Sequence, residues 1–325
     1  MDKINVAFIY KPDNVFLTGN HFDNTTYDFF MNALKRNNRI NVKFFPEKNK
    51  IDVSGFNKNF DLILIPNNFS DATPMLDGIS SSHLPVISRV GDPHDVSKYG
   101  KLPFHKKFKI NYYFNFMHSD YFYKYYPSNF NYKTIIFGCE SSKYHNLPLY
   151  DNRIKNKILV SGALGNPCLK SRIINRIINP KQYGWYHYKL RTLTSKHPDV
   201  IHSRNTENAN DLKEFSKILG QYAAAIAATT HYPTIKYLET TASGCLTFME
   251  ITEHNRGSYL GYEDEKTAIF INENNYKKKF SEFLNNPDDP KWKKIAEAGK
   301  KFTLENLSND KAVDNLVNLM EDVLR

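Results

Sequence analysis

Short apolar runs recur along the whole chain, and most are followed by a polar turn or by a segment of helical periodicity. Runs such as Asn5–Tyr10 and Asp61–Pro66 consist largely of aliphatic and aromatic residues. Continuous apolar strands that are separated by helices or turns indicate a parallel sheet covered on both faces. The sequence therefore predicts an α/β fold.

Two series of such runs are present, and the polar segment Leu147–Lys157 separates them. The first series predicts a helix within Phe22–Arg36 and strands at Asn5–Tyr10, Val42–Pro46, Asp61–Pro66, Pro85–Val90, Tyr112–Met117 and Thr134–Phe137. The second predicts strands at Lys157–Ser161, Asp199–His202, Ala223–Ala228, Cys245–Met249 and Ala268–Ile271. Helices are expected within Ser171–Ile178, Leu212–Tyr222 and Ile235–Ser243, followed by two helical patterns in Trp292–Arg325.

The length of the chain supports a division into two domains. A chain of 325 residues is about twice the usual size of a single domain. Because each series alternates strands with helices, we expect two doubly wound, Rossmann-like α/β domains. Their predicted bounds are residues 1–152 and 153–325, and the helical tail closes the second domain.

Composition excludes several other classes of protein. Hydrophobic residues make up 41% of the chain and charged residues 24%, so neither a disordered chain nor a coiled coil fits. The three cysteines, Cys139, Cys168 and Cys245, are too widely spaced for a disulfide framework or a CxxC zinc site, which favours a reducing, cytoplasmic compartment. No apolar stretch approaches the roughly 20 residues of a membrane helix, so we expect a soluble protein.

The chain is basic, because Lys and Arg exceed Asp and Glu by ten. This balance favours anionic partners such as phosphates, nucleic acid or an acidic membrane surface. The segment Lys98–Lys109 and the tyrosines after it interleave basic and aromatic residues. Such a segment can follow a nucleic-acid backbone, hold a sugar ring or touch lipid headgroups, and it is equally compatible with an ordinary basic surface.

The segment His231–Gly244 has the clearest functional pattern. Pro233 suits the first position of a helix, where its missing N–H would be unpaired in any case. The N–H groups of Thr234 and Ile235 would then face outward at a helix end whose dipole favours an anion. The sequence predicts phosphate binding at this helix start.

Glu239 lies on the same predicted helix, at the margin of its apolar stripe. Beside a phosphate site, a carboxylate at this position suits bidentate hydrogen bonding to a ribose diol. The alternative is a surface ion pair between Lys236 and Glu239, which would be worth roughly a few tenths of a kcal/mol.

A second pattern follows the predicted strand Lys157–Ser161. Gly162 would let the backbone approach a diphosphate closely, and Lys170 and Arg172, at the start of the next helix, would supply positive charge. The segment has neither the P-loop spacing nor a GxGxxG fingerprint, and simple solvation of Lys170 is the alternative.

Taken in order, these segments resemble the nucleotide-sugar-binding domain of GT-B glycosyltransferases of the group 1 superfamily, most closely the spore-maturation-type (CgeB-like) branch. The motif [RK]-[FY]-x-E-x-x-A-x-G is matched by Lys236–Gly244, and the glycine loop with its Lys/Arg pair by Gly162, Lys170 and Arg172. The resemblance covers roughly residues 155–325, and the first half resembles the family only in architecture. It implies two domains that face a cleft and C-terminal helices that cross back to the first domain.

One departure from the family pattern concerns a pair of glutamates. Retaining members often carry two glutamates separated by seven residues, and this chain has Glu239 at the second position but His231 at the first. The resemblance implies that Glu239 holds the donor ribose and that His231, a candidate catalytic residue, faces the sugar. The implied donor-binding residues are Gly162, Lys170, Arg172, Thr234, Ile235, Lys236 and Glu239. The donor sugar and the retaining outcome stay open.

The first domain would supply the acceptor side, because its loops after the strands are expected at the same cleft. Gly19 and His21 follow the first strand. Asp92 and His94 follow the strand Pro85–Val90 and are candidates to deprotonate or orient an acceptor hydroxyl, with solvation or helix capping as the alternative. The second domain lacks a DxD motif, so neither an essential metal nor a further cofactor is expected.

The sequence thus predicts a metal-independent glycosyltransferase that moves a hexosyl or pentosyl group from a nucleoside-diphosphate sugar to an acceptor hydroxyl. A glycan, a lipid-linked glycan and a modified DNA base are the acceptors considered, and the basic charge is also compatible with peripheral association with a membrane. The alternative is a non-catalytic nucleotide-sugar or nucleic-acid binding protein on the same fold. The oligomeric state is not predicted.

Overall fold

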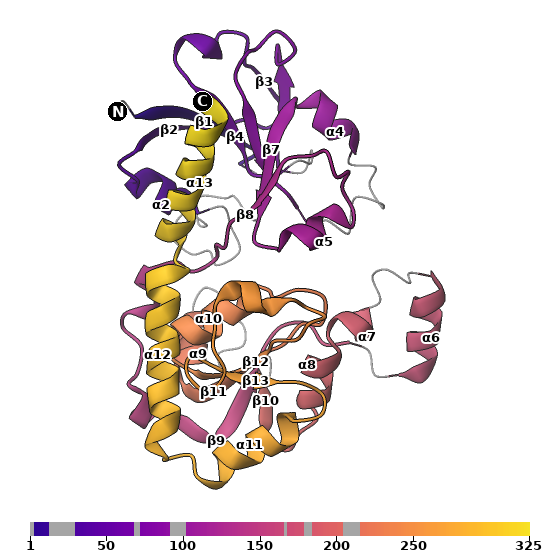
Figure 1. Cartoon of the computed structure of the whole chain (residues 1–325), viewed down its shortest axis with the longest axis vertical. Coiled ribbons are helices and arrows are strands. Elements are labelled where there is room, and N and C mark those ends of the chain that lie inside the picture. Colours follow the sequence, from indigo (N-terminus) through magenta and orange to yellow (C-terminus); the bar gives the residue numbers. More distant parts are fainter. Residues whose placement is uncertain are drawn as a thin grey trace. The chain divides into compact units, whose positions relative to one another are not determined.

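A computed structural model describes residues 3–12, 30–67, 72–91, 102–165, 168–178, 184–203 and 215–325. The chain divides into two compact units (Figure 1). Unit 1 runs to Gly138 and also includes Asn309–Arg325, and unit 2 is Cys139–Ser308. Each unit contains one main sheet in which every strand pair is parallel.

The main sheet of unit 1 has the strand order β2-β1-β4-β6-β7-β8. Its strands are β1 (Ile4–Tyr10), β2 (Ile40–Pro46), β4 (Leu62–Ile65), β6 (Val86–Arg89), β7 (Ile110–Asn115) and β8 (Tyr132–Thr134). The first five lie on predicted apolar runs, because strands that are covered on both faces need apolar side chains on both, whereas β8 shares only Thr134 with the predicted strand Thr134–Phe137. A small parallel pair, β3 (Lys50–Asp52) with β5 (Met75–Asp77), was not predicted.

Four helices of unit 1 are described: α2 (Met31–Arg36), α4 (Leu102–Lys107), α5 (Ser119–Tyr123) and the C-terminal α13 (Asn309–Leu324). Helix α13 packs against α2, and Arg36 pairs with Asp310 at 2.9 Å. Arg39 Nη2 lies 2.6 Å from Glu321 Oε1, which ties α13 to the segment before β2. The last helix therefore belongs to the unit formed by the first part of the chain, whereas the predicted bounds placed it in the second domain.

The sheet of unit 2 has the strand order β10-β9-β11-β12-β13. Its strands are β9 (Ile154–Val160), β10 (Val200–His202), β11 (Tyr222–Ala227), β12 (Leu246–Glu250) and β13 (Ile269–Ile271). The chain places β10 on one side of β9 and then crosses to β11 on the other side. This is the order of a doubly wound sheet with a topological switch point between β9 and β11.

Seven helices of unit 2 are described, and some of them cover the two faces of this sheet. They are α6 (Leu169–Ile178), α7 (Gly184–His187), α8 (Lys189–Thr194), α9 (Phe215–Gly220), α10 (Lys236–Ala242), α11 (Tyr276–Asn285) and α12 (Pro290–Asn306). Ile158 and Val160 of β9 pack with α11 and α12, whereas Leu159 between them packs with α9. Alternate residues of a strand point to opposite faces, so this is the predicted doubly wound arrangement.

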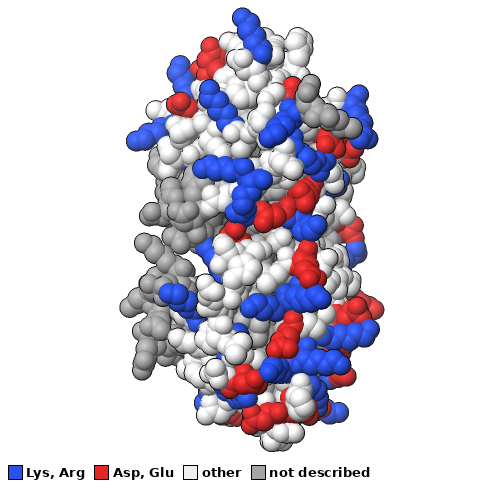
Figure 2. Space-filling view, turned by 90° about the vertical axis from the view of Figure 1, so that its left-hand side faces the viewer, with Lys and Arg blue, Asp and Glu red and all other residues white. Residues whose placement is uncertain are grey.

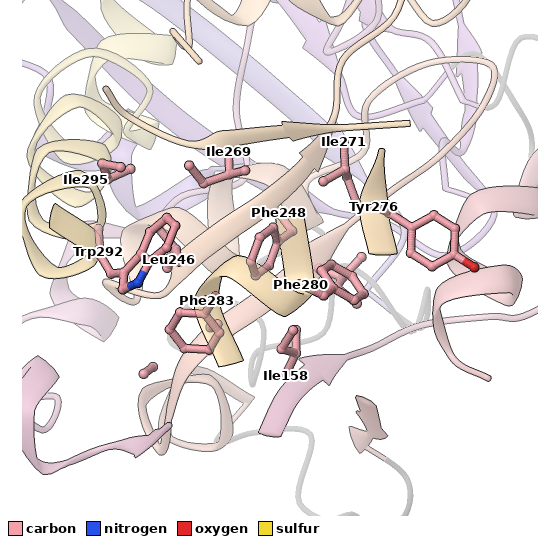
Figure 3. Close-up of a cluster of buried hydrophobic side chains, with 14 of the residues drawn as sticks. Ile158, Leu246, Phe248, Ile269, Ile271, Tyr276, Phe280, Phe283, Trp292 and Ile295 are labelled. Carbon is pink, nitrogen blue, oxygen red and sulfur yellow. The ribbon is translucent and has the colours of Figure 1, made fainter. Parts of the chain in front are cut away.

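The core between the sheet, α11 and α12 is rich in aromatic side chains (Figure 3). Phe280 of α11 is fully buried and meets the Phe248 ring edge to face at 4.8 Å between centroids. Phe283 makes the same type of contact with Trp292 of α12 at 5.9 Å. Helix α11, which anchors this core, was not predicted from the sequence.

The first unit ends at Gly138, whereas the predicted boundary follows residue 152. Tyr150, in the predicted polar linker, is buried in the hydrophobic core of unit 2. Charges of both signs are mixed along α12 and α13, as Figure 2 shows for this face, and Lys293 of α12 lies 2.6 Å from Asp151. Among the described helices, none has both the length and the hydropathy of a membrane-spanning segment.

The aromatic core predicts a large effect of one substitution. Phe280→Ala removes a ring that is 0% exposed and leaves a cavity, so the free energy of unfolding of unit 2 should fall by about 3–5 kcal/mol. Tryptophan fluorescence during denaturant unfolding measures this, because both tryptophans, Trp185 and Trp292, lie in unit 2. Ser281→Ala, at the exposed neighbour on the same helix, is the control and should change it by less than about 0.5 kcal/mol. Equal effects of the two substitutions would contradict the description of this core.

Candidate functional site

The carboxyl edge of the unit 2 sheet is the candidate site. In open parallel sheets, ligands bind beyond the carboxyl ends of the strands at the topological switch point, which here lies between β9 and β11. Three described segments meet this edge: 161–165 after β9, 228–235 after β11 and 251–257 after β12. Side chains from α8 and α10 complete it, as the contacts below show.

The loop after β9 is held by hydrogen bonds to its backbone. Arg191 Nη1 of α8 donates to the carbonyl of Ala163 at 3.1 Å, and His202 Nε2 lies 2.9 Å from the carbonyl oxygen of Gly162. Gly162 has a φ of +92°, and a Cβ there would lie 2.8 Å from Arg191 Nη1. Glycine is therefore required at this position both by the backbone conformation and by the close approach of a buried guanidinium.

The Tyr237 hydroxyl connects the loop after β11 with the end of β12. It accepts a hydrogen bond from the Thr229 N–H at 3.0 Å and donates one to the Glu250 carbonyl at 3.0 Å. The Asn255 side chain donates to the same Glu250 carbonyl at 2.6 Å and to the Thr229 carbonyl at 3.1 Å. Helix α10, which carries Tyr237, is thereby fixed in rotation and position at the carboxyl edge of the sheet.

Helix α10 begins at Lys236, three residues after the predicted start at Pro233, so that prediction was wrong. Thr234 and Ile235 precede the helix, and the Thr234 carbonyl accepts the Tyr237 N–H at 3.0 Å in a tight turn. The helical hydrogen bonds start with the Ile235 carbonyl, which accepts the Glu239 N–H at 2.9 Å. The turn formed by Thr234 takes the place of the first helical turn that Pro233 suggested.

Glu239 and Lys236 form the predicted i,i+3 pair, but the pair is buried. Lys236 Nζ lies 2.8 Å from Glu239 Oε2, and the two side chains are only 12% and 0% exposed. Lys236 also lies over the Phe215 ring of α9, 3.7 Å from its centroid. The surface alternative was therefore wrong, because every residue of α10 from Tyr237 to Ala242 is buried.

Glu250 is a second buried carboxyl group, at the last residue of β12. Glu250 is only 6% exposed. Burial raises the pKa of its carboxyl group to about 7, although the nearby positive charge of Arg191 opposes this shift. A carboxyl group that titrates near neutrality beside a buried guanidinium is typical of functional sites. The sequence analysis did not select Glu250 or Arg191.

Several buried polar atoms at this edge have no hydrogen-bond partner among the described residues. They are the hydroxyl oxygens of Thr230 and Thr234, Oε1 of Glu239 and Oε2 of Glu250, whereas Oε2 of Glu239 has the ion pair with Lys236. Unsatisfied buried polar atoms cost about 1–3 kcal/mol each and are rare in native proteins. Their concentration on the segments that meet at one sheet edge indicates a site that a polar ligand completes.

His231 lies in the loop after β11, in a row of histidine rings. Its ring centroid is 5.2 Å from that of His187 in α7 and 5.7 Å from that of His254. Within the described ranges, no group of three His, Cys, Asp or Glu side chains is arranged to hold a metal ion.

Lys170 and Arg172 are not brought to this edge. Both lie on α6, which Figure 1 shows standing apart from the sheet beside α7. Lys170 is exposed, and the Arg172 guanidinium lies 4.2 Å from the centroid of the Trp185 ring. Their predicted role in donor binding stays a prediction that no described contact to Glu239 supports. Gly19, His21, Asp92 and His94, the predicted residues of the first domain, lie outside the described residues.

Glu250 and Arg191, which the sequence analysis did not select, differ in how far the sequence could have indicated them. Glu250 directly follows the apolar run Cys245–Met249, so a carboxylate at the end of a buried strand was a detectable signal. Arg191 lies in a segment for which no element was predicted, and only the fold shows that it reaches Gly162.

No family model matches the chain, and no curated protein matches it. Solved structures do match. A glycosyltransferase from Rickettsia africae is 12% identical with a TM-score of 0.55, and the match covers 100% of both chains. Anabaena HepE in complex with UDP and glucose is 10% identical with a TM-score of 0.54, over 98% of this chain and 100% of that one. An alpha-glucosyltransferase in complex with UDP is 9% identical with a TM-score of 0.55, over 99% and 100%.

At such low identities the likeness shows the fold, which is that of the GT-B glycosyltransferases. The predicted fold class is thus confirmed. The spore-maturation-type branch stays a prediction.

The raised pKa of Glu250 predicts a pH-dependent stability. Below the ordinary carboxyl pKa, both the folded and the unfolded chain hold this proton. As the pH rises toward 7, the unfolded chain releases the proton while the folded chain keeps it, so the free energy of unfolding falls by at most about 3 kcal/mol. Glu250→Gln cannot ionise and should lack this fall.

Denaturant unfolding of the native protein and of Glu250→Gln, at about pH 5 and about pH 8, measures the effect. The variant should gain stability relative to the native protein at the higher pH. A difference between the two proteins that is the same at both pH values would show that Glu250 is not buried in this way.

Proposed function

We propose that the protein transfers a sugar from a nucleoside-diphosphate sugar to an acceptor hydroxyl, and that the donor binds at the carboxyl edge of the unit 2 sheet. The observation that carries this proposal is the set of unpartnered buried polar atoms at the switch point of the sheet. A nucleoside diphosphate offers hydroxyl donors and phosphate acceptors that match them. The complexes of HepE and of the alpha-glucosyltransferase with UDP support this class of donor.

Glu239 is the proposed partner of the donor ribose. Its carboxylate is fully buried, Oε2 pairs with Lys236, and Oε1 has no hydrogen-bond partner among the described residues. The two hydroxyls of a ribose diol would donate to these two oxygens, and a charge-assisted hydrogen bond of this type is worth about 1.5–3 kcal/mol. Lys236 Nζ, 2.8 Å from Oε2, places a positive charge beside this carboxylate.

Arg191 and Lys236 supply the positive charge for the proposed diphosphate subsite. Arg191 is 3% exposed and reaches the Gly162 backbone, where the absence of a side chain lets a ligand approach closely. Buried, preorganised cations stabilise the charge that develops on a departing nucleoside diphosphate, so the proposal needs no metal ion. Thr234 and Ile235 would contact the same phosphates through the turn before α10.

The remaining roles follow the resemblance. His231 would face the donor sugar, together with the Thr230 hydroxyl, which is buried without a partner among the described residues. Asp92 and His94 would prepare the acceptor hydroxyl, and Gly19 and His21 would line the acceptor side. Whether the configuration at the sugar is retained depends on the group opposite the leaving diphosphate, where His231 replaces an acidic residue.

The proposed ribose contact predicts that the substitution of Glu239 and the removal of the ribose 2′-hydroxyl affect the same hydrogen bond. The native protein should bind UDP about tenfold or more tightly than 2′-deoxy-UDP, because the missing hydroxyl leaves one Glu239 oxygen unpaired. Glu239→Gln should bind UDP more weakly and distinguish the two nucleotides by less than about threefold, as isothermal titration calorimetry measures. Glu282→Gln on the exposed side of α11, the matched control, should behave as the native protein. If the native protein and Glu239→Gln distinguish UDP from 2′-deoxy-UDP equally well, Glu239 does not bind the ribose.

A turnover assay distinguishes a glycosyltransferase from the alternative of a non-catalytic binding protein. Incubation with a panel of UDP-sugars should release UDP, and release should rise when an acceptor from the glycan, lipid-linked or DNA class is added. Tight UDP binding that depends on Glu239 with no release from any donor would favour a binding protein on the same fold.

A further inference from the structure

We propose that helix α6 docks the protein on the surface of a bilayer that contains anionic phospholipids, with its apolar side chains among the acyl chains and its basic side chains at the headgroups. This inference does not depend on the proposed function. It rests on the exposure and the charge of α6 and of the segment around it.

An apolar stripe on α6 is exposed to solvent. Leu169, Ile173 and Ile177 are 65%, 52% and 74% exposed, and their spacing of four residues places them on one face of the helix. Ile174 and Leu164 are also exposed, at 44% and 41%. Such side chains normally lie in the core, and their clustering on one short helix marks an interaction surface. The stripe therefore requires a partner that offers an apolar environment.

Basic side chains border this stripe. At about 100° of rotation per residue, Lys170 lies beside Ile177 on one flank and Arg176 beside Leu169 on the other. Lysine and arginine can extend their stems along apolar surface while their charges stay at the polar boundary. An apolar stripe with basic flanks is the pattern of helices that lie in the plane of a membrane surface.

The surrounding chain has one sign of charge. Residues 152–198 contain ten Lys and Arg and no Asp or Glu. Three of these ten, Lys155, Lys157 and Lys189, form ion pairs with Asp288, Asp199 and Glu273, and none of the three lies on α6. An acid-free segment of this length complements an anionic surface, and each basic residue near such a membrane strengthens binding about fivefold.

The geometry of α6 selects a position on the membrane rather than across it. The helix has 10 residues, which is about 15 Å, half the hydrocarbon thickness of a bilayer. Figure 1 shows α6 apart from the sheet of its unit, so the stripe can enter the headgroup layer while the sheet stays in water. Aliphatic side chains do not stack on bases as the aromatic residues of single-strand binding sites do, which favours lipid over nucleic acid.

Cys168 provides a direct probe, because it is exposed and immediately precedes α6, whereas Cys139 and Cys245 are buried. The full-length protein is labelled at Cys168 with an environment-sensitive fluorophore and mixed with phosphatidylcholine vesicles that contain about one-third phosphatidylglycerol. We expect a blue shift of the emission and quenching by lipids that carry a nitroxide near the top of the acyl chain. Pure phosphatidylcholine vesicles should bind at least about tenfold more weakly.

Two variants test the two parts of the contact. Ile173→Asn combined with Ile177→Asn should weaken vesicle binding at least about tenfold, and Ile173→Leu with Ile177→Leu, which keeps the apolar stripe, should retain it. Arg176→Gln should weaken binding about fivefold, and Lys277→Gln on the exposed side of α11 is the control of equal charge that should not.

Binding that the asparagine variant retains would overturn the proposal, as would a label that no lipid nitroxide quenches. A Cys168 signal that responds to protein concentration or to DNA and not to vesicles would assign α6 to a second copy of the chain or to nucleic acid instead.

Discussion

The hydroxyl of Tyr237 fixes the geometry on which the candidate site depends. It is buried between the loop after β11 and the end of β12, and it joins Thr229 to Glu250 through one accepted and one donated hydrogen bond. Because Tyr237 lies on α10, these bonds set the rotation of that helix, and the rotation decides that Glu239 points inward. A helix of 7 residues has little stability of its own, so its orientation comes from this tertiary contact.

This orientation concentrates unsatisfied polarity at one edge of one sheet. Burying carboxylates and hydroxyls without partners opposes folding, and the aromatic core around Phe280 and the other unit 2 contacts must offset that cost. Proteins keep such an arrangement where a ligand supplies the missing hydrogen bonds. Hydrogen bonds that are stronger in the transition state than with the bound substrate then increase the rate of the reaction. The raised pKa of Glu250 has the same origin, because its carboxyl group is buried, and the buried charge of Arg191 opposes the shift.

The sequence predicted the sheets well, because buried parallel strands such as β4 and β11 need uninterrupted apolar runs, and that signal is local. Glu239, Lys236 and Gly162 were selected from motif and resemblance, and the structure places all three at the carboxyl edge of one sheet.

The start of α10, the burial of the ion pair and the contact of Arg191 with the loop after β9 were not predictable. Each depends on contacts between residues far apart in the chain, such as Lys236 with Phe215 and Arg191 with Gly162. The exposed stripe of α6 illustrates the converse, since periodicity predicted a helix within Ser171–Ile178 but not that its apolar side chains would be exposed.

Hydrogen–deuterium exchange of the full chain with and without saturating UDP tests the central claim most directly. If the unpartnered polar atoms of unit 2 form the nucleotide site, UDP should slow exchange in 161–165, 187–192, 229–239 and 250–257 together, the segments that meet at the switch point of the sheet. Slowing confined to other segments of unit 2, or no change at a UDP concentration that calorimetry shows to be saturating, would contradict the account.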